Sequence, residues 1–530
     1  MLAGGCALLT ATACAQTWHF QASAGIRETL TDNVNLEPSD FAHSDLVSEL
    51  IPGFTVNEKG ARSDFSGSVR VPILFYVRTG AKNNKVLPEA NLRGRIEAVE
   101  NLFFVEGAAS VQQTFFTPFG AQPVSLVNAT SNRVRTESYR VTPYLKSPVK
   151  RELHYELRDD NIWTRLGSAP SGANDSYTNH LTGNITRDPT PVGWAVEIDR
   201  NEDKFVGQRP LITQLARGRL PVQIDPEVRV SATAGYEENR YTFTEPHGVI
   251  YGASAEWLPA PRTTLRAKWE HRFFGASYDF SFDDRTPRST WNFKASRNLT
   301  SYPQQLASLP ASGDVASTLN QLFLSRIPDP TERQTIVDQI INSAGLPTVL
   351  SGPITLFAQQ VYLQQDARAN VGILGARNHL LFTAYRTRIE PITGSGTPLP
   401  PELIAQNNNT QTGGNVVWDH TMTPTTTLSV NAAIARTVAN AGLEGTTTQR
   451  SVIAEFISQL SPALTAHLGM RYQIFHSDLA SSYHEAAIFA GLSYVCCSAS
   501  SRAVTTRGSS AATAGSSPSS GAESGPPSGY

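Results

Sequence analysis

The chain has 530 residues, a net charge of -2 at pH 7 and 17% charged residues, below the usual quarter for a soluble protein. This balance argues against a nucleic-acid partner, because binding to phosphates needs a basic face. The cysteines lie only near the two ends, as Cys6, Cys14, Cys496 and Cys497. The sequence between them therefore holds no disulfide framework and no cysteine metal site, and we expect neither a metal nor a cofactor.

The first 15 residues predict a signal peptide. The run "MLAGGCALLTATACAQ" is short and apolar and ends in a small-x-small cleavage site before Gln16. Lipidation at Cys14 is the alternative. No run of about 18 apolar residues follows, so we expect no transmembrane helix. An exported chain of this kind is soluble in the periplasm, secreted, or a barrel in the outer membrane.

From about residue 19 to residue 495 the chain alternates between apolar and polar side chains. Side chains of a strand point alternately to its two faces, so each segment has one apolar face and one charged face. The runs are roughly 10 to 14 residues long, enough to cross a bilayer at a tilt. The clearest are residues 65–77, 88–99, 263–274 and 463–474.

A soluble β-sandwich also alternates, but two features favour a barrel in the outer membrane. Charges stand in the middle of strands, as in a water-filled lumen, and aromatic side chains lie near strand ends, as in interfacial belts. The belt residues are Trp163, Trp257, Trp418 and Tyr494. We therefore predict an all-β, antiparallel transmembrane barrel over residues 16–495.

Short and long links tend to alternate between the predicted strands. Prolines precede many strands after short turns, and longer polar links lie between them, as with periplasmic turns and extracellular loops. This rule predicts roughly 16 to 22 strands, an even number, with both ends of the barrel in the periplasm. The charged faces supply the candidate lumen-lining residues, which are Arg93, Arg95, Glu97, Glu156, Arg158, Arg266, Lys268, Glu270 and Arg272. As an alternative, these rows are cross-strand ion pairs that fill a wet barrel.

Residues 312–346 break the strand pattern. "SGDVASTLNQLFLSRI" and "DPTERQTIVDQIINSAG" have the spacing of two short amphipathic helices. Because helices of this kind cannot lie in lipid between strands, we expect a helical hairpin that either caps the barrel rim or plugs the pore.

The last predicted strand ends at residue 495. Ile488, Ala490, Leu492 and Tyr494 share one face, and this phase is typical of a closing strand that ends on an aromatic residue, where the sequence has Cys496. Residues 496–530 are low in complexity and predict a disordered tail. A shifted reading frame or a natural Ser-rich extension would each explain it.

Motifs of catalysis are not found. "HEAAI" begins like a zinc-protease motif but has Ile488 where the second histidine belongs, and no nucleophile elbow or phosphate-binding loop occurs in a suitable context. Barrel enzymes that cut lipids use Ser/His pairs, and His271 and His467 are conceivable members, but no pairing is visible in the sequence. We expect no enzyme.

Several stretches resemble the outer-membrane proteins that accompany PEP-CTERM/exosortase systems in Gram-negative bacteria. These are "IRETLTDNVNLEPSD", "ELIPGFTVNEKGARSDFSGSV", "SVQQTFFTPFG", "STWNFKAS", "RIPDPTERQTIVDQI" and "GLSYV". The resemblance covers nearly all of residues 20–495 and implies a barrel in the outer membrane that is often encoded beside exopolysaccharide biosynthesis. It carries no catalytic residues, and the chain departs from it at Cys496.

The function we expect is a channel or scaffold in an exopolysaccharide/PEP-CTERM export system. The expected partners are outer-membrane lipid, the barrel assembly machinery and export components of that system. Two alternatives are a general solute porin and a barrel enzyme that acts on lipid or polysaccharide. Mixed charges on the predicted lumen face predict weak ion selectivity.

Overall fold

The structure is a computed structural model and describes residues 17–147, 153–167, 175–206, 209–241, 244–308, 360–392, 408–442, 444–496 and 499–502. The predicted signal peptide (1–15) and the predicted helical hairpin (312–346) lie outside these residues. Within the described part, no helix is long and apolar enough to cross a membrane.

Strands dominate the described chain. They are β1 (Thr17–Thr31), β2 (Asp45–Lys59), β3 (Ser63–Arg70), β4 (Ile73–Tyr76), β5 (Lys85–Val86), β6 (Glu89–Val99), β7 (Phe103–Phe115), β8 (Arg133–Lys146), β9 (Leu153–Gly167), β10 (Ser176–Arg187), β11 (Trp194–Phe205), β12 (Leu211–Gln223), β13 (Val228–Arg240), β14 (His247–Ala260), β15 (Thr263–Arg272), β16 (Gly275–Arg285), β17 (Ser289–Thr300), β18 (Tyr362–Leu374), β19 (Asn378–Pro391), β20 (Asn409–Thr423), β21 (Thr426–Ala439), β22 (Thr446–Ser461), β23 (Leu464–Ser477), β24 (Tyr483–Val495) and β25 (Ala499–Arg502). The described helices are the 3-10 turn η1 (Ser39–Phe41), α1 (Gly80–Asn83) and α2 (Tyr302–Ser308).

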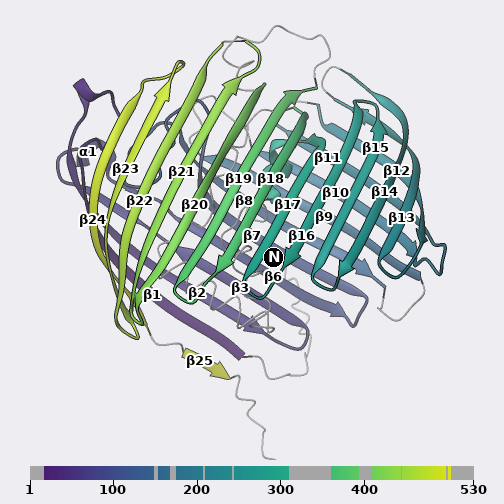
Figure 1. The fold of residues 1–530 in the computed structure, drawn as a ribbon, viewed down its shortest axis with the longest axis horizontal. Coiled ribbons are helices and arrows are strands. Elements are labelled where there is room, and N and C mark those ends of the chain that lie inside the picture. Colours follow the sequence, from purple (N-terminus) through teal and green to yellow (C-terminus); the bar gives the residue numbers. More distant parts are fainter. Residues whose placement is uncertain are drawn as a thin grey trace, which may run out of the picture.

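The strands close into one antiparallel barrel of 22 strands. β1 pairs with β2 on one side and with β24 on the other, with Ile26 opposite Leu492 at the closure. β3 and β4 are two parts of one wall strand, since both pair with β2, and β5 pairs only with β4. Figure 1 shows the tilted strands of the wall. The prediction of an even-numbered antiparallel barrel is confirmed, at the upper end of the expected count.

The two faces of each wall strand differ as the alternation predicts. On β23, Leu468 and Met470 are 61% and 62% exposed, whereas Gln473 is fully buried. A closed barrel exposes its outer face to the surroundings, so the exposed apolar side chains lie outside and the buried polar ones line the lumen. Trp163, Trp257, Trp418 and Tyr494, the predicted belt residues, are all exposed on the outer face.

The links differ in length between the two ends of the barrel. At one end, here called the turn end, neighbouring strands are joined by short turns. Examples are residues 60–62 between β2 and β3 and residues 462–463 between β22 and β23. At the other, the loop end, lie longer links such as residues 32–44, 77–88 and 116–132. By the usual asymmetry of such barrels, the turn end faces the periplasm.

The boundary of the predicted tail is corrected by the structure. Residues 499–502, expected to be disordered, form β25 and pair with β1 from Thr17 to Phe20. The backbone N–H of Cys496 still donates to the carbonyl of Ala22 at 2.8 Å. β1 extends beyond the end of β24, and its backbone groups there would otherwise lack partners. Residues 503–530 lie outside the described part.

Candidate functional site in the barrel lumen

All nine candidate lumen residues lie on the faces opposite the exposed apolar side chains, but the structure spreads them over three regions of the wall. β6 carries Arg93, Arg95 and Glu97, β9 carries Glu156 and Arg158, and β15 carries Arg266, Lys268, Glu270 and Arg272. Two strands, β7 and β8, lie between β6 and β9 in the wall, and five strands, β10 to β14, lie between β9 and β15. They therefore do not form a single site.

The β15 residues belong to a ladder of ion pairs that spans five strands. Glu270, only 2% exposed, binds Lys268 Nζ at 3.0 Å and Arg217 Nη1 at 3.0 Å. Arg217 in turn binds Glu197 on β11 at 2.6 Å. Arg217 crosses β13 and β14 to reach Glu270 because Gly235 and Gly252 stand between them. A Cβ at those glycines would lie 2.6 Å from Arg217 Cβ and 2.8 Å from Glu270 Cγ.

Arg272 and Arg266 take other carboxylates. Arg272 binds Glu237 at 2.5 Å, and Glu237 is fully buried and also accepts from the backbone N–H of Phe273 at 2.9 Å. Arg266 binds Glu256 on β14 at 2.8 Å in a more exposed position. Charged side chains buried in a wall are therefore neutralised locally.

The β6 and β9 residues have weaker or more exposed partners. Arg158 binds Glu106 on β7 and lies over the Tyr144 ring at 5.0 Å. Arg93 donates to Ser66 at 2.8 Å, and the Arg95 guanidinium lies 4.6 Å from the Phe104 ring centroid. Glu97 accepts from the backbone N–H of Asn101. Glu156 lies opposite Asn184 in the β9–β10 register.

The loop of residues 116–132, which joins β7 to β8, crosses the lumen. Its backbone carbonyls at Pro118 and Gln122 accept from Thr447 and Gln449 on β22. β22 is separated from β7 by β23, β24, β1, β2, the β3/β4 strand and β6. Thr447 and Gln449 are buried and face the lumen, so the loop lies inside the barrel rather than over its rim. We call residues 116–132 the crossing loop.

Glu485 on β24 is the polar centre on which the crossing loop is anchored. It is fully buried and accepts from Arg471 Nη2 at 2.7 Å, Thr31 Oγ1 at 2.7 Å and Asn128 Nδ2 at 3.1 Å. Its second oxygen accepts from Gln473 at 3.1 Å. The carboxylate thus joins β1, β23 and β24 to the crossing loop, with each oxygen accepting hydrogen bonds.

A second contact seats the loop against β4. The hydroxyl of Tyr76 donates to the carbonyl of Val127 at 2.6 Å, and Val127 packs with Val34, Val47 and Leu74. The Lys85 ammonium lies 5.8 Å from the Tyr76 ring centroid. Burial, and then the nearby Arg133 guanidinium, lowers the pKa of Lys85 to about 8. Residues distant in the sequence therefore fix the loop in one position.

On the opposite wall, α2 closes part of the loop end. Tyr302 and Leu306 are 1% and 3% exposed, and they form an apolar cluster with Val134, Leu166, Phe205, Leu211, Tyr241 and Val361. The Tyr302 and Phe205 rings lie 5.4 Å apart. Burial raises the pKa of the Tyr302 hydroxyl. The loop end is thus narrowed from two sides, by the crossing loop and by α2.

His467 on β23 lies between two inward-facing partners. Its Nδ1 is 2.9 Å from Glu455 Oε1 on β22, and its Nε2 is 3.0 Å from Ser493 Oγ on β24. When Nδ1–H donates to the Glu455 carboxylate, Nε2 is free to accept the proton of the Ser493 hydroxyl. This is the connectivity of a nucleophile, a base and a carboxylate that orients the base. The sequence singled out His467 but not its partners, which meet it only through strand register.

Other important residues were also missed from the sequence. The composition of residues 116–132 predicts only a polar link between strands, and nothing in the sequence marks Asn128, Gln473 or Glu485. Each has an ordinary polar side chain whose partner is hundreds of residues away or on a neighbouring strand. Among the described residues, no group of three or more His, Cys, Asp or Glu side chains is arranged to hold a metal ion.

The fold and the polar lumen define a membrane-spanning β-barrel of the outer-membrane type. No protein-family model matches the chain, and no curated protein matches it. Among solved structures, it is similar to the apoprotein form of the FrpB iron transporter from Neisseria meningitidis (F5-1 variant), at 7% identity over 90% of this chain and 81% of that one, with a TM-score of 0.49.

Two further solved structures are similar to the chain. The siderophore receptor PirA from Acinetobacter baumannii is 9% identical over 90% of this chain and 80% of its own, with a TM-score of 0.44. OccK1 (OpdK) from Pseudomonas aeruginosa is 8% identical over 90% of this chain and 99% of its own, with a TM-score of 0.34. The evidence for the function of this chain therefore lies in its own geometry.

Proposed function

We propose that this barrel is an outer-membrane channel for a neutral polysaccharide, working in an exopolysaccharide export system of the PEP-CTERM/exosortase kind. The observation that carries the substrate class is the chemistry of the lumen wall. The buried charges of the ladder from β11 to β15 are paired with one another, and the buried inward polar side chains from β19 to β21 are mainly amides and hydroxyls. The link to the export system rests on the sequence resemblance alone.

The wall from β19 to β21 is the part best suited to sugar hydroxyls. Its buried inward side chains are mainly uncharged and polar and include Thr383, Thr387, Asn409, Gln411, Asn415, Ser429 and Thr437. The Oδ1 atoms of Asn415 and Asn431 are buried and have no hydrogen-bond partner in the protein. A buried acceptor of this kind is satisfied by water or by a ligand hydroxyl. This strip favours hydroxyl-rich chains over ions.

A planar-bilayer experiment tests the channel. Neutral oligosaccharides added to the barrel should cause transient current blockades, and the double variant Asn415→Leu/Asn431→Leu should shorten them several-fold because it removes both free acceptors. Val416→Leu/Val430→Leu is the matched control, since these neighbours face outward. Open-channel ion selectivity should stay weak.

The opposite results are equally clear. Strong anion or cation selectivity with no blockade by neutral sugars would favour a general solute porin instead. Normal exopolymer secretion in a strain that lacks this chain would overturn the export role while leaving the channel intact.

The Glu455–His467–Ser493 arrangement favours a second candidate function, hydrolysis of an ester carried by the polymer in the lumen. Ser493 Oγ would attack the ester carbonyl while His467 Nε2 takes the hydroxyl proton and passes it to the leaving alcohol. Water, activated by the same histidine, would then release the acid and restore Ser493. Arg27 lies 3.9 Å from the same Glu455 oxygen and is the cation placed to stabilise negative charge there.

A fluorophosphonate probe distinguishes this function from a purely structural network. The assembled barrel should be labelled, and Ser493→Ala and His467→Gln should each reduce labelling by roughly 100-fold or more, in the range of lost general base catalysis. Ser451→Ala, an inward serine on β22, should label like the parent chain. Equal labelling of all four chains, or none of the parent, would leave the three residues as a structural hydrogen-bond network.

A further inference from the structure

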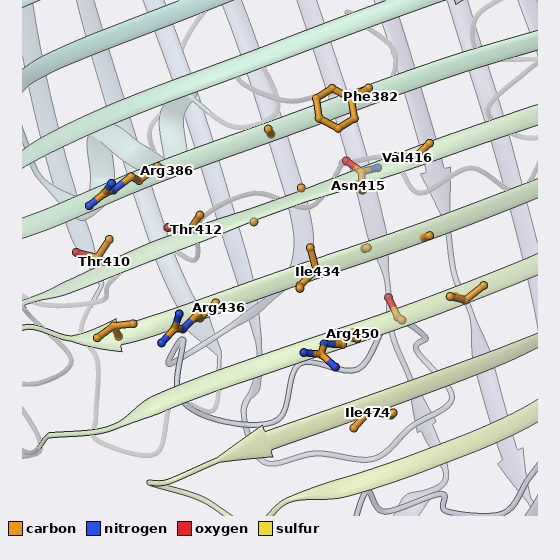
Figure 2. Close-up of a pocket in the computed structure, with 18 of the residues that line it drawn as sticks. Phe382, Arg386, Thr410, Thr412, Asn415, Val416, Ile434, Arg436, Arg450 and Ile474 are labelled. Atoms are coloured by element: carbon orange, nitrogen blue, oxygen red, sulfur yellow. The ribbon is translucent and has the colours of Figure 1, made fainter.

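The outer wall over β19–β23 contains a groove of about 920 Å³. Its floor is formed by Ala384, Gly414 and Ala432, which have a methyl side chain or none, and its sides are apolar. Figure 2 shows Phe382, Val416, Ile434 and Ile474 along it. These residues alternate with the lumen residues of the same strands, so the groove faces the membrane and not the channel.

Three arginines stand at the loop-end edge of this groove, and we call them the arginine rim. They are Arg386 on β19, Arg436 on β21 and Arg450 on β22, and all three are exposed. Arg386 and Arg436 lie in register on either side of Thr412, and Arg450 is opposite Ile434, one pair further down the wall. Figure 2 shows Arg386 and Arg436 toward one end of the groove and Arg450 beside Ile434.

The arginine rim differs from Arg135 and Arg388 of the outer wall in having no acid beside it. Arg388 is ion-paired with Glu390 on the same strand, and Arg135 with Glu137. Within the described residues, no carboxylate lies within 4.0 Å of any rim guanidinium. Three like charges held near one another beside an apolar surface are stabilised by an anion.

The position of the rim identifies the kind of anion. Each rim arginine lies a few residues from the loop end of its strand, at the level where an outer-leaflet headgroup meets its chains. The groove leads from there toward the turn end. A second depression of about 750 Å³ shares Val452 and Tyr472 with it and extends the apolar surface to β24 and β1. A ligand with several acyl chains would fill both.

We propose that this groove is a binding site for a phosphorylated, multiply acylated glycolipid of the outer leaflet. The rim guanidinium groups bind its phosphates in forked geometry, and the apolar floor holds its acyl chains. Short side chains at the floor let a chain lie against the strand backbone. The site is independent of the lumen, because it lies on the opposite face of the wall.

Native mass spectrometry of the full-length barrel, extracted in mild detergent and offered hexa-acylated bis-phosphorylated lipid A, tests the proposal. The parent chain should retain the lipid. The triple variant Arg386→Gln/Arg436→Gln/Arg450→Gln should weaken retention by roughly 100-fold, at about fivefold for each arginine near a charged surface. Ala432→Leu should weaken retention while leaving the rim intact, because the larger side chain fills the floor.

The matched control replaces three ion-paired arginines of the outer face, Arg135→Gln/Arg200→Gln/Arg388→Gln. This chain should retain the lipid as the parent does, and heat-modifiable migration should show that each variant is assembled. The proposal is overturned if both triple variants lose the lipid equally, or if lipid A without phosphates binds the parent equally well. Single rim variants, each about fivefold weaker, replace the triple if it does not assemble.

Discussion

Replacing residues 117–131 with a short Gly/Ser turn is expected to raise the single-channel conductance several-fold. The crossing loop lies inside the lumen and is bonded to β4 and, beyond β2 and β1, to β24 and β22, so its backbone and side chains occupy part of the conducting cross-section. β7 and β8 pair along their whole lengths without it, and the barrel should therefore still close. The measurement is conductance in planar bilayers, with uptake of large antibiotics by cells as a second readout.

A matched control shortens residues 478–482, which join β23 to β24 at the same end of the barrel. Their hydrogen bonds are made within the link and with Thr446 at the edge of neighbouring β22, not across the lumen, so this variant should conduct like the parent. If the loop replacement assembles and its conductance is unchanged, the crossing loop does not limit flow.

The second large effect is expected at Glu237. Glu237→Ala should destabilise the barrel by about 3–5 kcal/mol, because it leaves the buried Arg272 guanidinium without its carboxylate. The two side chains are 0% and 9% exposed, so water does not replace the lost partner. The shift appears as a lower temperature for loss of the heat-modifiable band, or as a lower urea midpoint after refolding into micelles.

Two comparisons separate this effect from a general loss of fold. Glu100→Ala breaks the ion pair with Arg62, whose side chains are 57% and 67% exposed, and should change stability by less than about 1 kcal/mol. The double variant Glu237→Ala/Arg272→Met removes both buried charges and should recover much of the loss. A Glu237→Ala chain as stable as the parent would mean that water reaches Arg272.

The sequence by itself determined the architecture of this protein. A period of two is a local property, and one strand such as β23 shows it completely, with Leu468 and Met470 outside and Arg471 and Gln473 inside. Link lengths then ordered the strands and predicted an even count, since an antiparallel barrel with short turns has little choice of topology. The same parity placed all nine candidate charges opposite the apolar face.

Only the tertiary structure decided which inward residues meet. Thr31 and Asn128 lie 454 and 357 residues from Glu485 in the sequence and meet at its carboxylate, because closure of the barrel brings β1 beside β24 and the crossing loop spans the lumen. The sequence fragment around Asn128 has only the composition of a polar link, which contains no information about a partner 357 residues away.

The register between neighbouring strands is the second feature that the sequence does not determine. It decides which side chains meet across the sheet, both in the hydrogen-bonded sites and in the packed wall. His467 acquires Glu455 and Ser493, and Arg386 and Arg436 come to flank Thr412, through pairings between strands whose alternation looks the same at every shift of two residues. Alternation fixes the face that a side chain takes. Its neighbours across the sheet are set by turns, closure and the packing of the whole wall.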